Sequence, residues 1–226
     1  MIKSIIYKEW IKVRVTFAAL FLLNVLVVLS ISISTGNKFI FFDAATIYSK
    51  AIFYQDLFFI DLMFIPFITG LILGIIQYFP EMNSNRLKLA LHLPMNESKT
   101  LLSIQFFGLF LLFLIYLIDT LAIATVGGIY FSSEIINGFL LVSLPWYLAG
   151  FSVYIMISVI FIEPLWSRRI LLMIVSAGFI NNMFSGIIFV NAIELFSLSL
   201  PYFIVLTFIL SPLILLSGSN YKRGTK

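Results

Sequence analysis

Long runs of apolar residues, separated by short polar segments, fill most of this chain. The runs cover residues 15–33, 57–79, 101–131, 138–162, 170–190 and 200–217. A helix needs about 20 apolar residues to cross the hydrocarbon core of a bilayer. Five of the runs reach that length comfortably, whereas Pro201 and Pro212 leave the limits of the last one open. The pattern predicts an all-α membrane protein with six transmembrane helices in a single domain over residues 1–226.

Composition supports this class and leaves little room outside the membrane. Hydrophobic residues make up 62% of the chain and charged residues only 11%, whereas about a quarter of a soluble domain is charged. The longest polar connections, Ser34–Asp56 and Pro80–Thr100, have about 20 residues each. Chains below ~40 residues rarely fold unaided, so we expect no separate soluble domain. The chain has no cysteine, which excludes disulfides and thiolate chemistry.

The positions of lysine and arginine predict the orientation. If the N-terminus is cytoplasmic, 12 of the 14 basic residues fall in cytoplasmic segments, and only Lys38 and Lys50 fall outside. Short loops rich in lysine and arginine stay in the cytoplasm. We therefore expect both termini and the 80–100 loop to be cytoplasmic. The net charge of +4 then reflects this topology, and we expect membrane lipid rather than nucleic acid as a partner.

The first 14 residues have an amphipathic pattern that differs from the spans. Apolar and polar residues recur at helical spacing on two sides: Ile2, Ile5, Ile6, Trp10 and Val13 on one, Lys3, Ser4, Lys8, Glu9 and Lys12 on the other. Such a pattern is typical of a helix lying in the membrane interface, with its lysines toward anionic headgroups. The alternative is a solvated, positively charged N-terminus that only fixes orientation.

The loop between the second and third runs is unusually apolar for a cytoplasmic segment. It contains four alternating leucines: Leu87, Leu89, Leu91 and Leu93. A lone strand at a membrane surface would leave its backbone groups unpaired, so a short helix over residues 84–94 is favoured. Ser84 is a plausible N-cap, and Pro94 prevents continuation of the helix. Such a helix must bury its leucines against lipid or a partner protein.

This loop carries a family resemblance. Its residues 91–96, Leu-His-Leu-Pro-Met-Asn, resemble the Leu-x-x-Pro-hydrophobic-Ser/Asn segment of ABC-2-type ATP-binding-cassette exporter permeases. The six spans and the amphipathic start are similar to the same family. Many members have glycine where Asn85 stands and an acidic residue where Lys88 stands, so this chain departs from the pattern at two positions.

The resemblance implies a function, a location and partners. The chain would be the non-catalytic transmembrane subunit of an exporter in the bacterial cytoplasmic membrane. It would pair with a second permease copy or a similar permease, and with separate ABC ATPase subunits that bind ATP and Mg²⁺, so that no cofactor binds this chain. The family's coupling helix docks on the ATPase, and here it would comprise Arg86, Leu87, Lys88, Leu91, His92, Leu93, Pro94 and Met95.

Catalytic motifs are missing from the sequence. It contains no Gly-x-x-x-x-Gly-Lys-Ser/Thr segment for ATP phosphates and no His-Glu-x-x-His segment for zinc. His92 is the single histidine, and we interpret it as a polar-face residue of the short helix. The absence of these motifs argues against a further possibility, that the chain is an intramembrane enzyme.

Polar residues within the apolar runs are the remaining functional candidates. Intramembrane carboxylates are costly and often functional, which makes Asp61 and Asp119 candidates for a substrate pathway; the alternatives are contact with interfacial water and helix packing. A rival function is a proton-coupled secondary transporter that uses these two carboxylates, although its expected inverted repeats are not visible. Asn181 and Asn182 indicate a packing or dimer face, or substrate contact. The glycines of Gly70-Leu-Ile-Leu-Gly74 indicate close helix packing.

Overall fold

A computed structural model describes residues 2–53, 57–83, 96–184 and 192–223. All elements of these segments are helical, as the sequence predicts. They are α1 (Ile2–Phe41), α2 (Ala44–Phe53), a 3₁₀ turn η1 (Ile60–Leu62), α3 (Ile65–Asn83), α5 (Glu97–Tyr130), α6 (Ser133–Ile162), α7 (Trp166–Phe184), α8 (Ala192–Ile209) and α9 (Leu213–Arg223).

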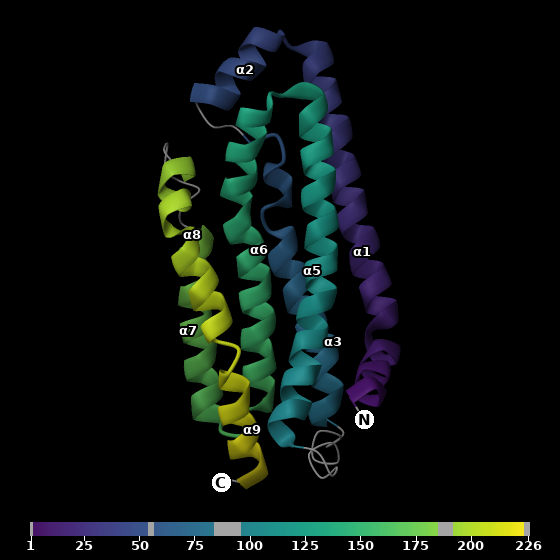
Figure 1. Ribbon diagram of the computed structural model, residues 1–226, viewed down its shortest axis with the longest axis vertical. Helices are drawn as coiled ribbons and strands as arrows, with labels where there is room; N and C mark the ends of the chain where they lie inside the picture. The colour runs from purple at the N-terminus through teal and green to yellow at the C-terminus, as the bar shows by residue number, and fades with distance from the viewer. Residues whose placement is uncertain (1, 54–56, 84–95, 185–191, 224–226) are drawn as a thin grey trace.

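The long helices lie side by side in an elongated bundle, where α1, α3, α5, α6, α7 and α8 alternate in direction and α9 continues in the direction of α8 (Figure 1). Both chain termini lie at one end of this bundle, which we call the terminal end. The short helix α2 lies across the opposite end, which we call the α2 end (Figure 1). The helix α6 is central, because it packs against α3, α5, α7, α8 and α9.

Several helices have the length and apolarity of membrane-spanning segments. In the described part of the chain, five stretches qualify: Lys3–Phe41, Ile60–Met82, Glu97–Tyr130, Ser133–Ile162 and Leu200–Tyr221. The run predicted over residues 170–190 continues into 185–191, which lie outside the described residues. Its described part belongs to α7, which begins near two arginines and ends near two asparagines.

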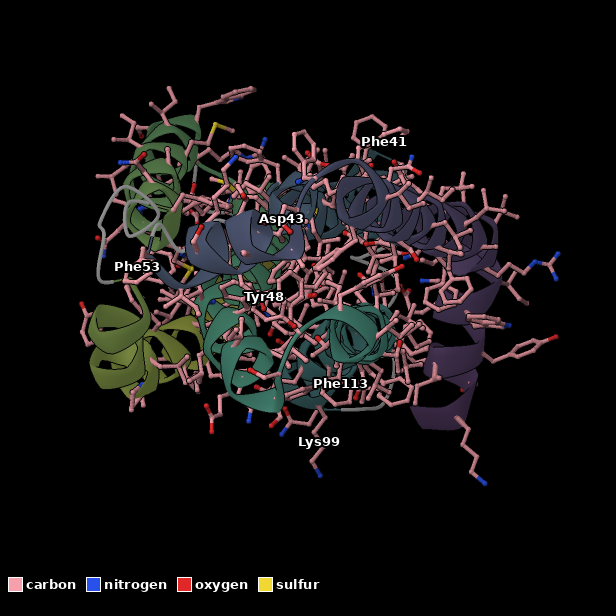
Figure 2. All side chains as sticks on the ribbon, turned by 90° about the horizontal axis from the view of Figure 1, so that it is seen from above. Phe41, Asp43, Tyr48, Phe53, Lys99 and Phe113 are labelled. Carbon is pink, nitrogen blue, oxygen red and sulfur yellow. The ribbon has the colours of Figure 1, made fainter. Side chains whose placement is uncertain are left out.

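The first helix is longer than the sequence predicts. Residues 34–41, assigned to a polar connection, continue α1, and α2 occupies most of the remaining connection. The helix continues through Thr35 because its hydroxyl donates to the carbonyl of Ile31 (2.8 Å) and so finds a partner within the helix. The first turns of α1, drawn in the darkest purple, are seen nearly end-on in Figure 1 and from the side in Figure 2. The start of α1 is therefore inclined to the long axis of the bundle. The interfacial position of residues 1–14 stays a prediction.

Two predicted spans are interrupted. The run 57–79 forms a continuous α-helix only from Ile65, where Pro66 follows in the first turn, a position that suits proline because its missing N–H has no partner there anyway. The run 200–217 is divided between α8 and α9 at Pro212, since a proline inside a helix removes a hydrogen bond. The start of α5 is capped by Asn96, whose side chain accepts a hydrogen bond from the Ser98 amide (3.1 Å).

Glycines allow α3 and α6 to approach closely. A Cβ atom on Gly70 would lie 2.2 Å from the carbonyl oxygen of Gly150, and one on Gly74 would lie 3.0 Å from the side chain of Ile157. Both glycines of the Gly-x-x-x-Gly segment therefore face α6. Their predicted packing role is confirmed.

The serines of α6 have partners in their own helix as well as in neighbouring helices. Ser152 donates to the Leu148 carbonyl (2.8 Å) and lies 3.2 Å from the Thr207 hydroxyl of α8. Ser158 donates to the Ile155 carbonyl (2.6 Å). These bonds keep the hydroxyls satisfied in a helix that is largely buried.

Candidate functional site

A group of polar and charged side chains, most of them buried, lies toward the terminal end between α1, α3 and α6. We call it the ionic cluster. It consists of Lys8, Glu9, Lys12, Gln77, Glu81 and Tyr154.

The charged part of the ionic cluster contains two carboxylates and two ammonium groups. Glu81, 1% exposed, lies 2.9 Å from Lys8 Nζ and 3.1 Å from Lys12 Nζ through its Oε1. Lys12 Nζ also lies 2.7 Å from Oε2 of Glu9, which is completely buried. Burying charge in apolar surroundings is costly unless each ion is paired and hydrogen-bonded. The formal charges of the four side chains balance, which makes this burial tolerable.

Neutral groups extend the ionic cluster into the bundle core. Gln77 Nε2 donates to Glu9 Oε2 (3.1 Å) and to the Ile104 carbonyl (3.0 Å). The Tyr154 hydroxyl donates to Gln77 Oε1 (2.8 Å) and approaches the Gln105 carbonyl (3.2 Å). One continuous set of hydrogen bonds therefore joins α1, α3, α5 and α6.

The network reaches the C-terminal helices through the side chain of Gln105. Its Nε2 donates to the Ser158 hydroxyl (3.2 Å), and its Oε1 accepts from the Ser211 hydroxyl (2.9 Å). Ser211 lies in the break between α8 and α9. The polar connection thus runs from the start of the chain to its last described helices.

Local spacing explains how the sequence builds the ionic cluster. Gln77 and Glu81 are four residues apart on α3 and therefore share a face, as do Glu9 and Lys12 three residues apart on α1. The side of the first turns of α1 that packs on the bundle contains both apolar and charged residues, because Val13 and Glu9 are completely buried. Trp10, expected on the apolar side, is 40% exposed. The predicted division of this segment into an apolar and a charged side is therefore wrong.

The sequence reasoning missed the ionic cluster. It placed Glu9 and Lys12 on the polar side of an interfacial helix, with the lysines toward lipid headgroups, and gave no role to Gln77, Glu81 or Tyr154. The available signal was the set of polar residues close to the end of the second apolar run, at helical spacing. Pairing with α1 depends on contacts between residues 69 positions apart, which spacing along one helix does not reveal.

A second, smaller polar contact lies at the terminal end beside α6. Glu163 is 3% exposed, lies 3.8 Å from Arg168 Nη1, and accepts from Asn220 Nδ2 (3.5 Å). The Arg169 guanidinium donates to the Glu163 carbonyl and lies 5.4 Å from the Trp166 ring. These contacts attach the start of α7 and the end of α9 to the end of α6. Charged side chains therefore stabilise the terminal end in two places, here and in the ionic cluster.

The two candidate carboxylates of the apolar runs occupy different environments. Asp61 is exposed in η1, whereas Asp119 of α5 is 2% exposed and lies close enough to Tyr116 and Tyr147 to interact electrostatically. Asp119 Oδ2 has no hydrogen-bond partner among the described residues. Within the same residues, no ion pair or hydrogen bond joins Asp61 to Asp119.

The remaining predicted residues are placed as follows. Asn181 and Asn182 are exposed on α7, and a Cβ atom on the nearby Gly178 would meet nothing within 4 Å. The coupling residues Arg86, Leu87, Lys88, Leu91, His92, Leu93, Pro94 and Met95 lie outside the described residues. The described residues contain no group of three or more histidine, cysteine, aspartate or glutamate side chains that could hold a metal ion.

Comparison of this chain with protein-family models, with curated proteins and with solved structures finds no match. The functional interpretation therefore rests on the short motif over residues 91–96 and on the geometry of the bundle.

Proposed function

We propose that this chain is the membrane-spanning subunit of a bacterial ABC-2-type exporter. The observation that carries the proposal is the ionic cluster, which joins the start of α1 to the end of α3. Glu81 lies two residues before Asn83, the last residue of α3. The segment 84–94, which resembles a coupling helix, follows directly. A force applied to that segment would reach α3 and α1 together.

The arrangement of the helices supports a six-span topology with both termini in the cytoplasm. Five stretches qualify as spans, and α7 continues the alternation between α6 and α8, so that both termini lie at the same end (Figure 1). The terminal end also contains the four basic residues at the start of α1, Lys99 of α5 and Arg168 of α7, whereas the α2 end has Lys38 of α1 and Lys50 of α2. This asymmetry follows the positive-inside rule.

The proposed mechanism uses the ionic cluster as a mechanical joint. Closure of ATP-bound ATPase subunits would push on residues 84–94 and displace the end of α3. Because Lys12 bonds to both Glu9 and Glu81, α1 would follow α3 instead of sliding along it. Separating them would expose unpaired charge to an apolar environment, which costs several kcal/mol. ATP and Mg²⁺ belong to the ATPase, and a second permease copy would complete the pathway.

The experiment tests the contact between the loop and an ATPase. The full chain is co-expressed with an ABC ATPase subunit and purified through a tag on the chain, and ATP hydrolysis is measured. Leu91→Asp would bury a charge in the interface, so we expect loss of both co-purification and stimulated hydrolysis, whereas Leu91→Met retains them. Wild-type behaviour of Leu91→Asp in both measurements would overturn the proposal.

The rival function is proton-coupled transport through Asp119 and Asp61. It is favoured by one observation, the buried Asp119 carboxylate with an unpartnered oxygen, because such a group is suited to bind a proton within the membrane. Vesicles containing only the purified chain would then take up protons under an imposed membrane potential. Uptake that is abolished by Asp119→Asn and unaffected by ATP would favour this rival over the exporter subunit.

A further inference from the structure

The α2 end of the bundle contains a cavity of about 310 Å³ between the last turns of α1 and the helix α2. Lys38 and Lys50 both line it, together with the Thr46 side chain and an apolar wall that includes Phe39, Phe58 and Phe131. Figure 2 looks onto this end and shows α2 lying across the bundle, with Tyr48 directed toward the bundle and Phe41 away from it.

Lys38 lies in the last turn of α1 and Lys50 in the last turn of α2, and they are the basic residues that these two helices have at the α2 end. Both are exposed, and neither forms a salt bridge within the described residues. The acidic residues nearest to the two lysines in the sequence are Asp43 and Asp56. Asp43 does not line this cavity, Asp56 lies outside the described residues, and Glu134 lines a separate cavity on the Ile52 side of α2. Among the described residues, the lining of the cavity therefore carries two positive charges and no carboxylate.

The apolar wall is held in place by contacts between aromatic rings. The ring of Phe131 stacks on Phe58 (5.4 Å between centroids) and meets Phe39 edge-on (5.5 Å). The Tyr48 hydroxyl donates to the Tyr130 carbonyl (2.7 Å) and so attaches α2 to the end of α5. Because the wall draws on α1, α2, α5 and the segment before η1, it does not depend on a ligand for its shape.

We propose that this cavity binds an amphiphile with an anionic head group, such as a phosphate or carboxylate. The head group would lie between Lys38 and Lys50, which are exposed lining residues, because a lysine can keep its charged end in water while its stem covers apolar surface. The apolar part would lie against the phenylalanine rings. Ligand pockets range from about 300 to 1,000 Å³, so this one holds a head group and a short apolar segment, and any longer acyl chain would extend outside it. This inference is independent of the proposed exporter function.

Binding is tested with the full chain in phosphatidylcholine nanodiscs and a photoactivatable dodecyl phosphate. We expect cross-links to peptides from residues 35–58, and competition by dodecyl phosphate but not by dodecylphosphocholine, which has no net charge. The variant Lys38→Gln/Lys50→Gln should reduce labelling roughly 10- to 30-fold, since a lysine near an anionic surface contributes about 1 kcal/mol.

A matched control is available at the terminal end. Lys99 is exposed and also lines an apolar groove, together with Ile6 and Phe106, so Lys99→Gln should leave labelling of the α2 end unchanged. Thr46→Trp provides a steric test, because Thr46 is exposed and a larger side chain there fills the mouth without entering the core. Its labelling should fall while its unfolding temperature stays that of the wild type.

The outcomes are decisive for the proposal and for the source of the ligand. Wild-type labelling of Lys38→Gln/Lys50→Gln, or equal competition by dodecylphosphocholine, would overturn it. Replacing phosphatidylcholine by phosphatidylglycerol in the nanodiscs identifies the source: suppressed labelling assigns the site to a membrane phospholipid, and unchanged labelling assigns it to a free anionic amphiphile.

Discussion

The two ends of the bundle use lysine in opposite ways. At the terminal end, Lys12 is only 13% exposed in its side chain and contacts two buried carboxylates. At the α2 end, Lys38 and Lys50 are exposed, and aromatic rings hold the helices together instead. A paired lysine contributes to the fold, whereas an unpaired one remains available to a ligand. Substitutions at the two ends should therefore have different consequences.

The largest difference is expected between Lys12→Met and Lys38→Met. The first leaves Glu9 without its ion-pair partner in a buried position, and breaking such a pair typically costs about 3–5 kcal/mol. The second removes an exposed, unpaired charge and should change the free energy of unfolding by less than about 0.5 kcal/mol. Denaturation of the purified chain in mixed micelles measures both. Equal losses for the two variants would mean that the ionic cluster does not stabilise the terminal end.

A smaller change in the free energy of unfolding is expected for a substitution in the middle of the bundle, where α3 packs against α6. Gly70→Ala places a methyl group against the Gly150 backbone, and forcing such a shift typically costs about 1–3 kcal/mol. Gly178→Ala is the control, because nothing lies within 4 Å of its Cβ position, and alanine favours a helix over glycine by up to ~1 kcal/mol. The same denaturation experiment should give effects of opposite sign, and a destabilised Gly178→Ala would contradict this packing.

The hydroxyl groups of two tyrosines sharpen the comparison further. Tyr154→Phe leaves the buried Gln77 Oε1 without its donor, so we expect a loss of about 1–2 kcal/mol. Tyr48→Phe removes a partly buried bond to the Tyr130 carbonyl, with an expected loss of about 0.5–1 kcal/mol. Hydrogen exchange can locate each change: protection should fall in α3 for the first variant and in α2 for the second. Loss of protection at the opposite end would be inconsistent with two separate networks.

The smallest effect is expected for Asp61→Asn. Asp61 is exposed in η1, so its neutralisation should change stability by less than about 0.5 kcal/mol. Under the exporter proposal, vesicles containing the wild type or this variant should take up protons no faster than empty vesicles. Proton uptake by the wild type that the stable variant loses would instead support the proton-coupled rival and give the α2 end a chemical role.

The features that could be predicted are those that depend on local pattern. Length and apolarity predict the long helices, and the spacing of Gly70 and Gly74 predicts close packing, because each follows from the pattern of residues within one element. Exact limits could not be predicted from apolarity, since a helix such as α1 continues through polar residues whose side chains bond to their own backbone, as Thr35 does. A run of apolar residues also conceals a break such as the one at Pro212.

The ionic cluster and the cavity could not be predicted in the same way. Both depend on residues from helices far apart in the sequence, such as Lys12 with Glu81 and Lys38 with Phe131. The positive-inside count singled out Lys38 and Lys50 as the basic residues outside the cytoplasm, yet only the three-dimensional arrangement places them on one cavity. Pattern along the chain identifies which residues are unusual, and packing between helices determines what they contact.

The hydrogen bonds of α6 also bear on how the chain is assembled during synthesis. The Ser152 and Ser158 hydroxyls have acceptors in their own helix, so α6 can enter lipid before any later helix exists. Tyr154 needs acceptors from α3 and α5, which are synthesised earlier and are already in place when α6 emerges. Thr207 of α8, the partner of Ser152, arrives afterwards. The order of these residues along the chain thus lets the Ser152, Tyr154 and Ser158 hydroxyls find partners as soon as α6 leaves the ribosome and the insertion machinery.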